Sequence, residues 1–156
     1  MAEQNVPARN RRILTRLGAT AVAVAATLGL GTGIADATTS ATPCAPTAKA
    51  CMDLSARQAW LTDGAGHVIA GPFAARGGKS GAATPTGTFT VQKKVKNYWS
   101  QAFDAPMPNS VFFKPGYAFH AGSPGIASNG CIHLNRAASQ RFFDTLAPGD
   151  QVQIVP

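Results

Sequence analysis

The sequence predicts a mainly β domain with one short helix, placed behind an export signal. Two observations carry this prediction. From Leu54 onward, short apolar segments with alternating character are separated by Gly- and Pro-containing turns. Only one segment, which follows Cys131, repeats apolar residues at helical spacing. The chain has 156 residues, which is enough for one domain of ordinary size.

The first 37 residues have the pattern of a secretory signal peptide, which we expect to be cleaved near Ala37. An apolar stretch over residues 17–34 ends in the small residues Ala35-Asp36-Ala37, and it is preceded by a basic patch of Arg9, Arg11, Arg12 and Arg16. The adjacent arginines also resemble a twin-arginine signal, so the Sec and twin-arginine routes both stay open. An uncleaved membrane anchor is the alternative, because about eighteen residues is near the lower limit for crossing a bilayer.

The next segment, residues 38–53, is rich in Pro, Ala and Thr, and it predicts a flexible lead-in with ordered structure beginning near Cys51. The domain proper is expected over residues 54–156. Its first elements are strands at residues 58–62 and 67–70. Asp63-Gly64-Ala65-Gly66 lies between them, which is typical of a hairpin loop.

Two further strand regions follow. Residues 88–96 alternate in character and predict a single strand, with one face formed by Phe89, Val91, Lys93 and Val95. Residues 111–113 and 117–119 flank Lys114-Pro115-Gly116, where Pro and Gly fit the central positions of a type II turn. This second hairpin places His120 at the end of a strand.

The predicted helix begins after Asn135, which can cap its amino terminus, and it ends before Pro148-Gly149-Asp150. Its buried side would carry Ala138, Phe142 and Leu146. A last strand is expected over residues 151–155, with Val152 and Ile154 facing inward. The Phe residues of the chain are interpreted as members of one hydrophobic core.

The sequence contains three cysteines, and an odd number in an exported protein leaves one thiol unpaired. Cys44 and Cys51 are seven residues apart, and their pairing in an oxidising compartment would leave Cys131 free. A lone cysteine is often a small buried hydrophobe. Gly130 and two nearby histidines favour a nucleophile instead.

A cysteine nucleophile requires a partner that accepts its proton. His120 and His133 are the neighbouring candidates. We expect His120 to be the base because it arrives from a separate strand and can approach the thiol freely. His133 is only two residues from Cys131, and we expect it to be solvated or to contact substrate.

Acyl transfer also requires donors for a developing oxyanion, and consecutive backbone N–H groups in a tight turn provide them. Asn129, Gly130 and Cys131 are the candidates. Gly130 would allow a sharp bend and close approach of substrate. Asn129 tolerates positive φ better than most residues, and its side chain can brace a turn.

Ser128-x-Gly130-Cys131-Ile132-x-Leu134 resembles the signature of the L,D-transpeptidase catalytic domain, the YkuD-type family. Two further segments resemble motifs of that family, over a likeness that spans about residues 54–156: Thr84-Pro85-Thr86-Gly87-Thr88-Phe89 and Phe119-His120-Ala121-Gly122. Asn129 replaces the family's His before Gly-Cys, and His133 replaces its usual Arg. The interval from His120 to Cys131 is also shorter than usual.

The resemblance implies a β-sandwich or mixed-sheet fold and a secreted cysteine acyltransferase that needs no cofactor. Its substrates would be peptidoglycan stem peptides, which it would join by 3-to-3 cross-links, and a carbapenem would form a covalent adduct with it. By this resemblance Cys131 is the nucleophile and His120 the base. The carbonyl of Ala121 would hold the imidazole tautomer, and Ser128 would brace the loop.

Composition favours an anionic polymer as partner, because residues 38–156 carry ten Lys or Arg and five Asp or Glu, a net charge of about +5. No recognition helix or aromatic-basic repeat indicates nucleic acid, so we expect no nucleic-acid partner. No basic amphipathic helix indicates a membrane surface, so we expect no membrane contact after signal removal.

Three alternative classes stay open at this point. A cell-wall cysteine peptidase or amidase would use the same Cys/His pair but pass the acyl group to water. A zinc site of His120, Cys131 and His133 lacks a fourth ligand and recognisable spacing, so we expect no metal. A non-catalytic peptidoglycan-binding protein would have lost activity through Asn129.

Overall fold

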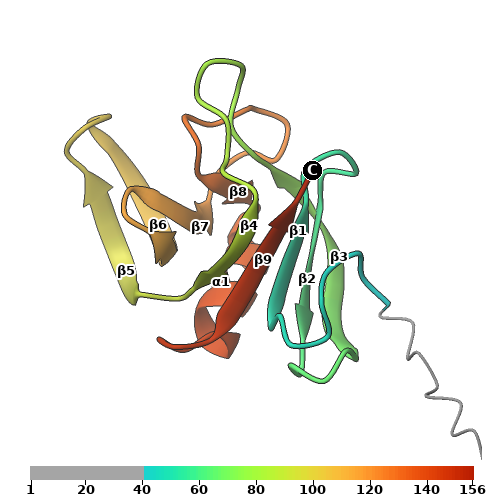
Figure 1. Cartoon of the computed structure of the whole chain (residues 1–156). Helices are drawn as coiled ribbons and strands as arrows, with labels where there is room; N and C mark the ends of the chain where they lie inside the picture. The colour runs from blue at the N-terminus through green and yellow to red at the C-terminus, as the bar shows by residue number, and fades with distance from the viewer. Residues whose placement is uncertain (1–40) are drawn as a thin grey trace, which may run out of the picture. The chain divides into compact units, whose positions relative to one another are not determined.

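A computed structural model describes residues 41–156 of the chain (Figure 1). The predicted signal peptide, residues 1–37, lies outside the described residues. Within residues 41–156 the structure contains no helix whose length and apolar character would let it cross a membrane.

The described chain is mainly β with one helix, as predicted. The strands, in chain order, are β1 (Ala50–Asp53), β2 (Gln58–Thr62), β3 (Val68–Arg76), β4 (Gly87–Thr90), β5 (Lys93–Ser100), β6 (Ala105–Lys114), β7 (Tyr117–Ala121), β8 (Ile132–Leu134) and β9 (Gln151–Val155). The helix α1 (Arg136–Thr145) lies between β8 and β9. Both predicted hairpins are present, and Gly116 has φ +80°, as the second central position of a type II turn requires.

The strands form one mixed sheet in the order β4-β9-β1-β2-β3-β8-β7-β6-β5. The pairs β1–β9 and β7–β8 are parallel, and the other pairs are antiparallel. Although β4 and β5 are consecutive in the chain, they lie at opposite edges of this order. Only two residues join them, so the sheet must curl until its edges approach each other (Figure 1).

The predicted single strand over residues 88–96 is wrong, because the chain turns a corner at Val91 and Gln92 and forms two strands, β4 and β5. The backbone N–H of Val91 donates to Asp150 O, whereas the next N–H, that of Gln92, donates to Phe112 O on β6. Val95 therefore packs beside Met107 and Phe112, away from the main core that contains Val91. The alternation of the sequence continues through the corner, but the backbone changes its partner strand there.

Helix α1 contributes to the main core inside the curled sheet. Its N-cap is Asn135, as predicted, and the Asn135 side chain accepts a hydrogen bond of 2.8 Å from the backbone N–H of Ala138. Phe142 is fully buried, with its ring centroid 5.0 Å from that of Phe119 on β7. Strand β7 and helix α1 are thus packed on each other.

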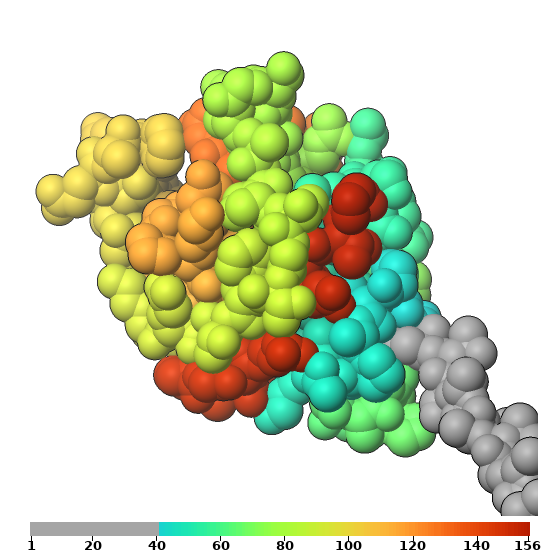
Figure 2. All heavy atoms as spheres, viewed as in Figure 1, coloured from blue at the N-terminus to red at the C-terminus, as the bar shows by residue number. Residues whose placement is uncertain are grey.

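The predicted flexible lead-in over residues 38–53 is wrong for its described carboxyl-terminal part. Order was expected from about Cys51, where β1 pairs with both β2 and β9, but it begins earlier, because Cys44 and Ala48 are already buried. Cys44 and Cys51 are joined by the predicted disulfide and are buried beside Trp60. The space-filling view shows this segment lying directly against the carboxyl-terminal strand (Figure 2).

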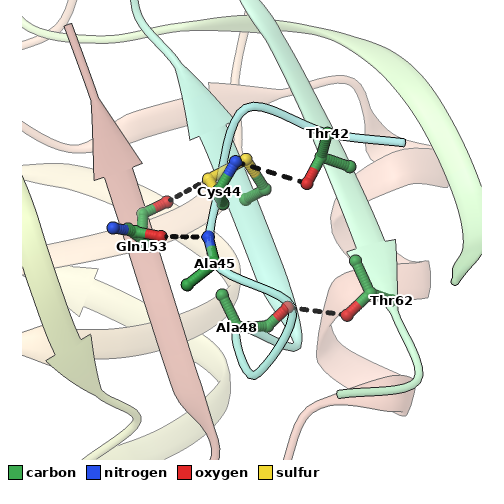
Figure 3. Close-up of a disulfide and its surroundings, with 7 residues drawn as sticks. Thr42, Cys44, Ala45, Ala48, Thr62 and Gln153 are labelled. Atoms are coloured by element: carbon green, nitrogen blue, oxygen red, sulfur yellow. Dashed lines mark hydrogen bonds between the residues drawn. A yellow bond between two sulfur atoms is a disulfide. The ribbon is translucent and has the colours of Figure 1, made fainter. Parts of the chain in front are cut away.

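Hydrogen bonds hold the disulfide loop on the sheet (Figure 3). The backbone N–H of Ala45 donates to Gln153 Oε1 at 2.6 Å, and the hydroxyl of Thr62 donates to the backbone carbonyl of Ala48 at 2.6 Å. Pro, Ala and Thr in this segment do not reveal burial by themselves, because the partner strand lies about a hundred residues away at β9.

We expect the double variant Cys44→Ala/Cys51→Ala to lose about 2.5 kcal/mol of unfolding free energy, the loop-closure value for a ring of this size. Because the disulfide loop packs on the sheet, unfolding of the domain also releases this loop, so the disulfide stabilises the whole domain. Urea unfolding of the variant and of the non-reduced parent measures the difference. A loss below about 1 kcal/mol would show that the disulfide loop unfolds independently of the core.

Candidate active site

Parallel pairing of β7 and β8 brings His120 and Cys131 to one pocket. Phe119 lies opposite Ile132 and His120 opposite His133, so Cys131, just before β8, is level with Ala118, two residues before His120 on β7. Both side chains line a pocket of about 260 Å³. The pocket is also lined by other residues that the sequence singled out: Ala121, Ser128, Asn129 and His133.

The imidazole of His120 is held in one tautomer. Its Nδ1 lies 2.9 Å from the backbone carbonyl oxygen of Ala121, so Nδ1 carries the proton and donates it, while Nε2 keeps a free lone pair. The residue is only 6% exposed. The pKa of His120 is lowered from 6.5 to about 4, chiefly by burial; the Ala121 hydrogen bond opposes this shift and the neighbouring His133 adds to it. At neutral pH His120 is therefore an uncharged proton acceptor.

Cys131 is the free cysteine of residues 41–156 and is half-buried. Burial raises the pKa of its thiol, and the backbone N–H of Ala118 partly offsets this effect. The thiol donates toward the backbone carbonyl of Gly116 at 3.7 Å. The resting site therefore holds a neutral thiol and a neutral imidazole.

Ser128 organises the cysteine loop, residues 128–131. Its hydroxyl donates to the backbone carbonyl of Cys131 at 2.5 Å and accepts from the backbone N–H of Gly130 at 2.9 Å. The expectation that Gly130 supplies an oxyanion donor is therefore wrong, because Ser128 already takes its N–H. The N–H groups of Asn129 and Cys131 are the candidate donors in this loop.

Gly130 is required by the backbone of this loop. Its φ is +116°, and a Cβ at this position would lie 2.6 Å from the ring of Tyr117. Its carbonyl accepts a hydrogen bond of 2.8 Å from the hydroxyl of buried Thr84, which itself accepts from the N–H of Gly78 at 2.9 Å. Thr84 was not predicted as a site residue, although its position at the start of the Thr-Pro-x-Gly-x-Phe segment was a signal.

Asn129 and His133 replace the family's charged or titratable side chains at the pocket. Asn129 is exposed, and its φ is not positive, so the expected advantage of Asn in a left-handed conformation does not apply. His133 Nδ1 lies 3.0 Å from the backbone carbonyl of Ile126. Its ring stands edge-on to that of His120 at 5.0 Å between centroids, so the two imidazoles form one wall of the pocket.

The hairpin of β5 and β6 supplies pocket residues that the sequence did not indicate. Ser100, Phe103 and Met107 line the His120 pocket, and they also line a second pocket that includes Tyr98, Gly116 and Cys131. Phe103 is 57% exposed, unlike the Phe residues of the core. Cys131 thus lies where two pockets meet.

A buried imidazole with a fixed tautomer, a free thiol and a Gly-bent loop define a site for cysteine-dependent acyl transfer. The sequence model of the L,D-transpeptidase catalytic domain, YkuD, matches residues 47–154. The chain belongs to this family.

Solved structures agree with this membership. An L,D-transpeptidase from Stackebrandtia nassauensis is 28% identical with a TM-score of 0.65, and the match covers 69% of this chain and 54% of that one. One from Xylanimonas cellulosilytica is 24% identical, with a TM-score of 0.65 and coverage of 73% and 63%. L,D-transpeptidase 3 from Mycobacterium tuberculosis, in complex with a faropenem-derived adduct, is 18% identical, with a TM-score of 0.59 and coverage of 69% and 59%.

The last two similarities concern the fold alone. The matches span between about half and two thirds of those solved chains. Among curated proteins, none matches this sequence.

Proposed function

We propose that the protein is an exported L,D-transpeptidase that joins peptidoglycan stem peptides by 3-to-3 cross-links through a thioester on Cys131. The observation that carries the proposal is the shared pocket of Cys131 and His120, whose Nε2 is free to accept a proton. Family membership supports the same reaction class.

In the first step the Cys131 sulfur attacks the carbonyl carbon between the third and fourth residues of a donor stem. The thiol must first turn away from Gly116 O toward His120, which takes its proton on Nε2. The oxyanion would be met by the N–H groups of Asn129 and Cys131. The C–N bond then breaks, D-alanine leaves with the proton from His120, and a thioester is left.

In the second step the side-chain amine of an acceptor stem attacks the thioester carbonyl. His120 Nε2 takes a proton from the amine and returns it to the Cys131 sulfur as the C–S bond breaks. A two-substrate reaction needs two approaches to one sulfur, and the two pockets that meet at Cys131 provide them. This arrangement favours transpeptidation over hydrolysis, for which one pocket would be sufficient.

Export is supported by the amino-terminal sequence pattern and by the Cys44–Cys51 disulfide, since such bonds persist in oxidising compartments. The direct test of the proposed reaction is incubation of the protein with disaccharide-tetrapeptides, followed by mass spectrometry. We expect a 3-to-3 dimer and one released D-alanine per cross-link. Release of D-alanine with only tripeptide monomers would instead identify a peptidase.

The pH dependence of acylation is expected to reflect the low pKa of His120. The imidazole accepts a proton only when neutral, and this form predominates above its pKa of about 4. The rate constant for acylation by a carbapenem, measured under subsaturating conditions, should stay level from pH 7 to about pH 5 and then fall about tenfold per pH unit below about pH 4. A fall centred near the ordinary histidine value of about 6.5 would contradict a buried base.

The substitution Asn129→His tests whether this site needs the family's imidazole. Because Asn129 is exposed and the loop is held by Ser128 and Gly130, we expect the carbapenem acylation rate to change by less than about tenfold, or roughly 1.4 kcal/mol in barrier. Stopped-flow or mass-resolved acylation kinetics measure the rate. A parent protein that is as inactive as Cys131→Ala, and is rescued by Asn129→His, would indicate a binding protein that has lost its activity.

A further inference from the structure

A separate, polar pocket is lined by Thr84, whose hydroxyl also bonds to the carbonyl of Gly130 in the cysteine loop. It has a volume of about 290 Å³ and shares no lining residue with the pocket of His120. Two arginines, Arg57 and Arg76, line it together with Gly77, Gly78 and Thr84. The loop that follows Gly77 projects from the end of the sheet, as Figures 1 and 2 show.

Neither arginine has a carboxylate partner within residues 41–156. The ion pairs of this part of the chain are Lys49–Asp150 and His67–Asp63. The acid nearest in sequence to Arg57 is Asp53, whose carboxylate accepts from Ser55 Oγ at 2.8 Å and from the backbone N–H of Ala56 at 2.7 Å. Two guanidinium groups that line one pocket without a carboxylate partner favour an anion there.

The backbone of both arginines is held by hydrogen bonds or strand pairing. Arg57 has φ +55°, and its carbonyl accepts a hydrogen bond of 2.9 Å from the N–H of Ala75 on β3. Arg76 is the last residue of β3 and pairs with His133 on β8. The two side chains therefore come from neighbouring parts of one sheet, and ordering them around a ligand costs little backbone entropy.

The floor of this pocket has no room for larger residues. A Cβ on Gly77 would lie 2.6 Å from Leu54 Cδ2 and 2.8 Å from Thr84 Oγ1, and one on Gly78 would lie 1.9 Å from Ala82 O. Lys79 follows directly, is exposed, and donates its backbone N–H to Ser128 O at 3.0 Å. Two arginines thus line a pocket in which Gly77 and Gly78 have no room for a side chain, and Lys79 follows directly in the chain.

We propose that Arg57 and Arg76 form an anion site that binds a phosphate group of a polyanionic chain, with Lys79 meeting a neighbouring charge. Guanidinium groups match phosphate oxygens through paired N–H donors. The two coplanar oxygens of a carboxylate match one guanidinium fork, whereas the tetrahedral oxygens of a phosphate point in several directions and can accept from both arginines. The site would hold the protein on a phosphate-rich polymer of the envelope and does not depend on the reaction at Cys131.

The test is fluorescence anisotropy with labelled long-chain polyphosphate near 0.15 M salt. We expect Arg57→Gln/Arg76→Gln to weaken binding at least about tenfold, since each lost charged hydrogen bond is costly. The matched control Arg136→Gln/Arg141→Gln, which removes the same charge from exposed positions on α1, should weaken it less than about threefold. Cys131→Ala should bind like the parent.

Two outcomes would overturn the proposal. Equal weakening by both double variants would show only attraction by net charge. Binding of poly-L-glutamate as tight as that of polyphosphate, with the same sensitivity to Arg57 and Arg76, would identify a carboxylate polymer instead. If the glutamine variant does not fold, Arg57→Lys/Arg76→Lys keeps the charge but loses the paired donors, and it should still weaken polyphosphate binding severalfold.

Discussion

Replacing Cys131 with alanine is expected to reduce acyl transfer by more than about a thousandfold, because no other group in the pocket can form the thioester. The fold should survive. Cys131 is half-buried at the margin of the small cluster of Met107, Phe112 and Ala118, outside the main core. Release of D-alanine from tetrapeptide stems measures the activity, and thermal unfolding measures the fold.

Cys131→Ser is the matched control for this prediction. It keeps a nucleophilic atom and nearly the same volume, but an oxygen of much higher pKa replaces sulfur. We expect its activity to be far below that of the parent and its unfolding temperature to be close to that of the alanine variant. Release of D-alanine by Cys131→Ala at the parent rate would show that another residue is the nucleophile.

His120→Ala is expected to lower the acylation rate constant by about a hundredfold to ten-thousandfold, the usual contribution of a general base. The loss follows from the imidazole, whose Nδ1 is bonded to Ala121 O, which leaves Nε2 as the proton acceptor in the pocket that also holds Cys131. Raising the pH should partly restore the rate of the variant, since hydroxide can then generate the thiolate. Burst kinetics with a carbapenem separate this step from later ones.

The corresponding variant of the other histidine is the control for His120. His133→Ala leaves the Ala121 hydrogen bond intact, and we expect a smaller loss together with a change in substrate affinity, as for a residue that contacts substrate. A greater loss in His133→Ala than in His120→Ala would show that His133 is the base.

Features specified by local chemistry were predictable from the sequence. Pro115-Gly116 encodes a turn within four residues, and the turn fixes the start of β7 and so the place of His120 near its end. Asn135 caps the helix through a bond to Ala138, three residues away. The Cys44–Cys51 ring also depends on a short separation. These contacts join residues that are close in sequence, so they depend little on the rest of the fold.

Features that depend on distant partners were not predictable. The segment before β1 is ordered because Ala45 and Lys49 donate hydrogen bonds to β9, at the other end of the domain. Val91 turns the chain from one sheet edge to the other through contacts with Gly149 and Asp150. The hydrogen bond from Thr84 to Gly130 was not predictable either, because the two residues are 46 positions apart in the sequence. Composition and periodicity indicate the secondary structure of a segment, but they do not indicate which other segment it will pack against.

The central claim, that Cys131 is the nucleophile of an acyl-enzyme with His120 as its base, is tested most directly by mapping a carbapenem adduct. The protein would be incubated with the carbapenem, digested without reduction, and its peptides sequenced by mass spectrometry. We predict one added carbapenem mass, located on Cys131, and none in the Cys131→Ala protein. An adduct on another residue, or one that persists in Cys131→Ala, would contradict this account.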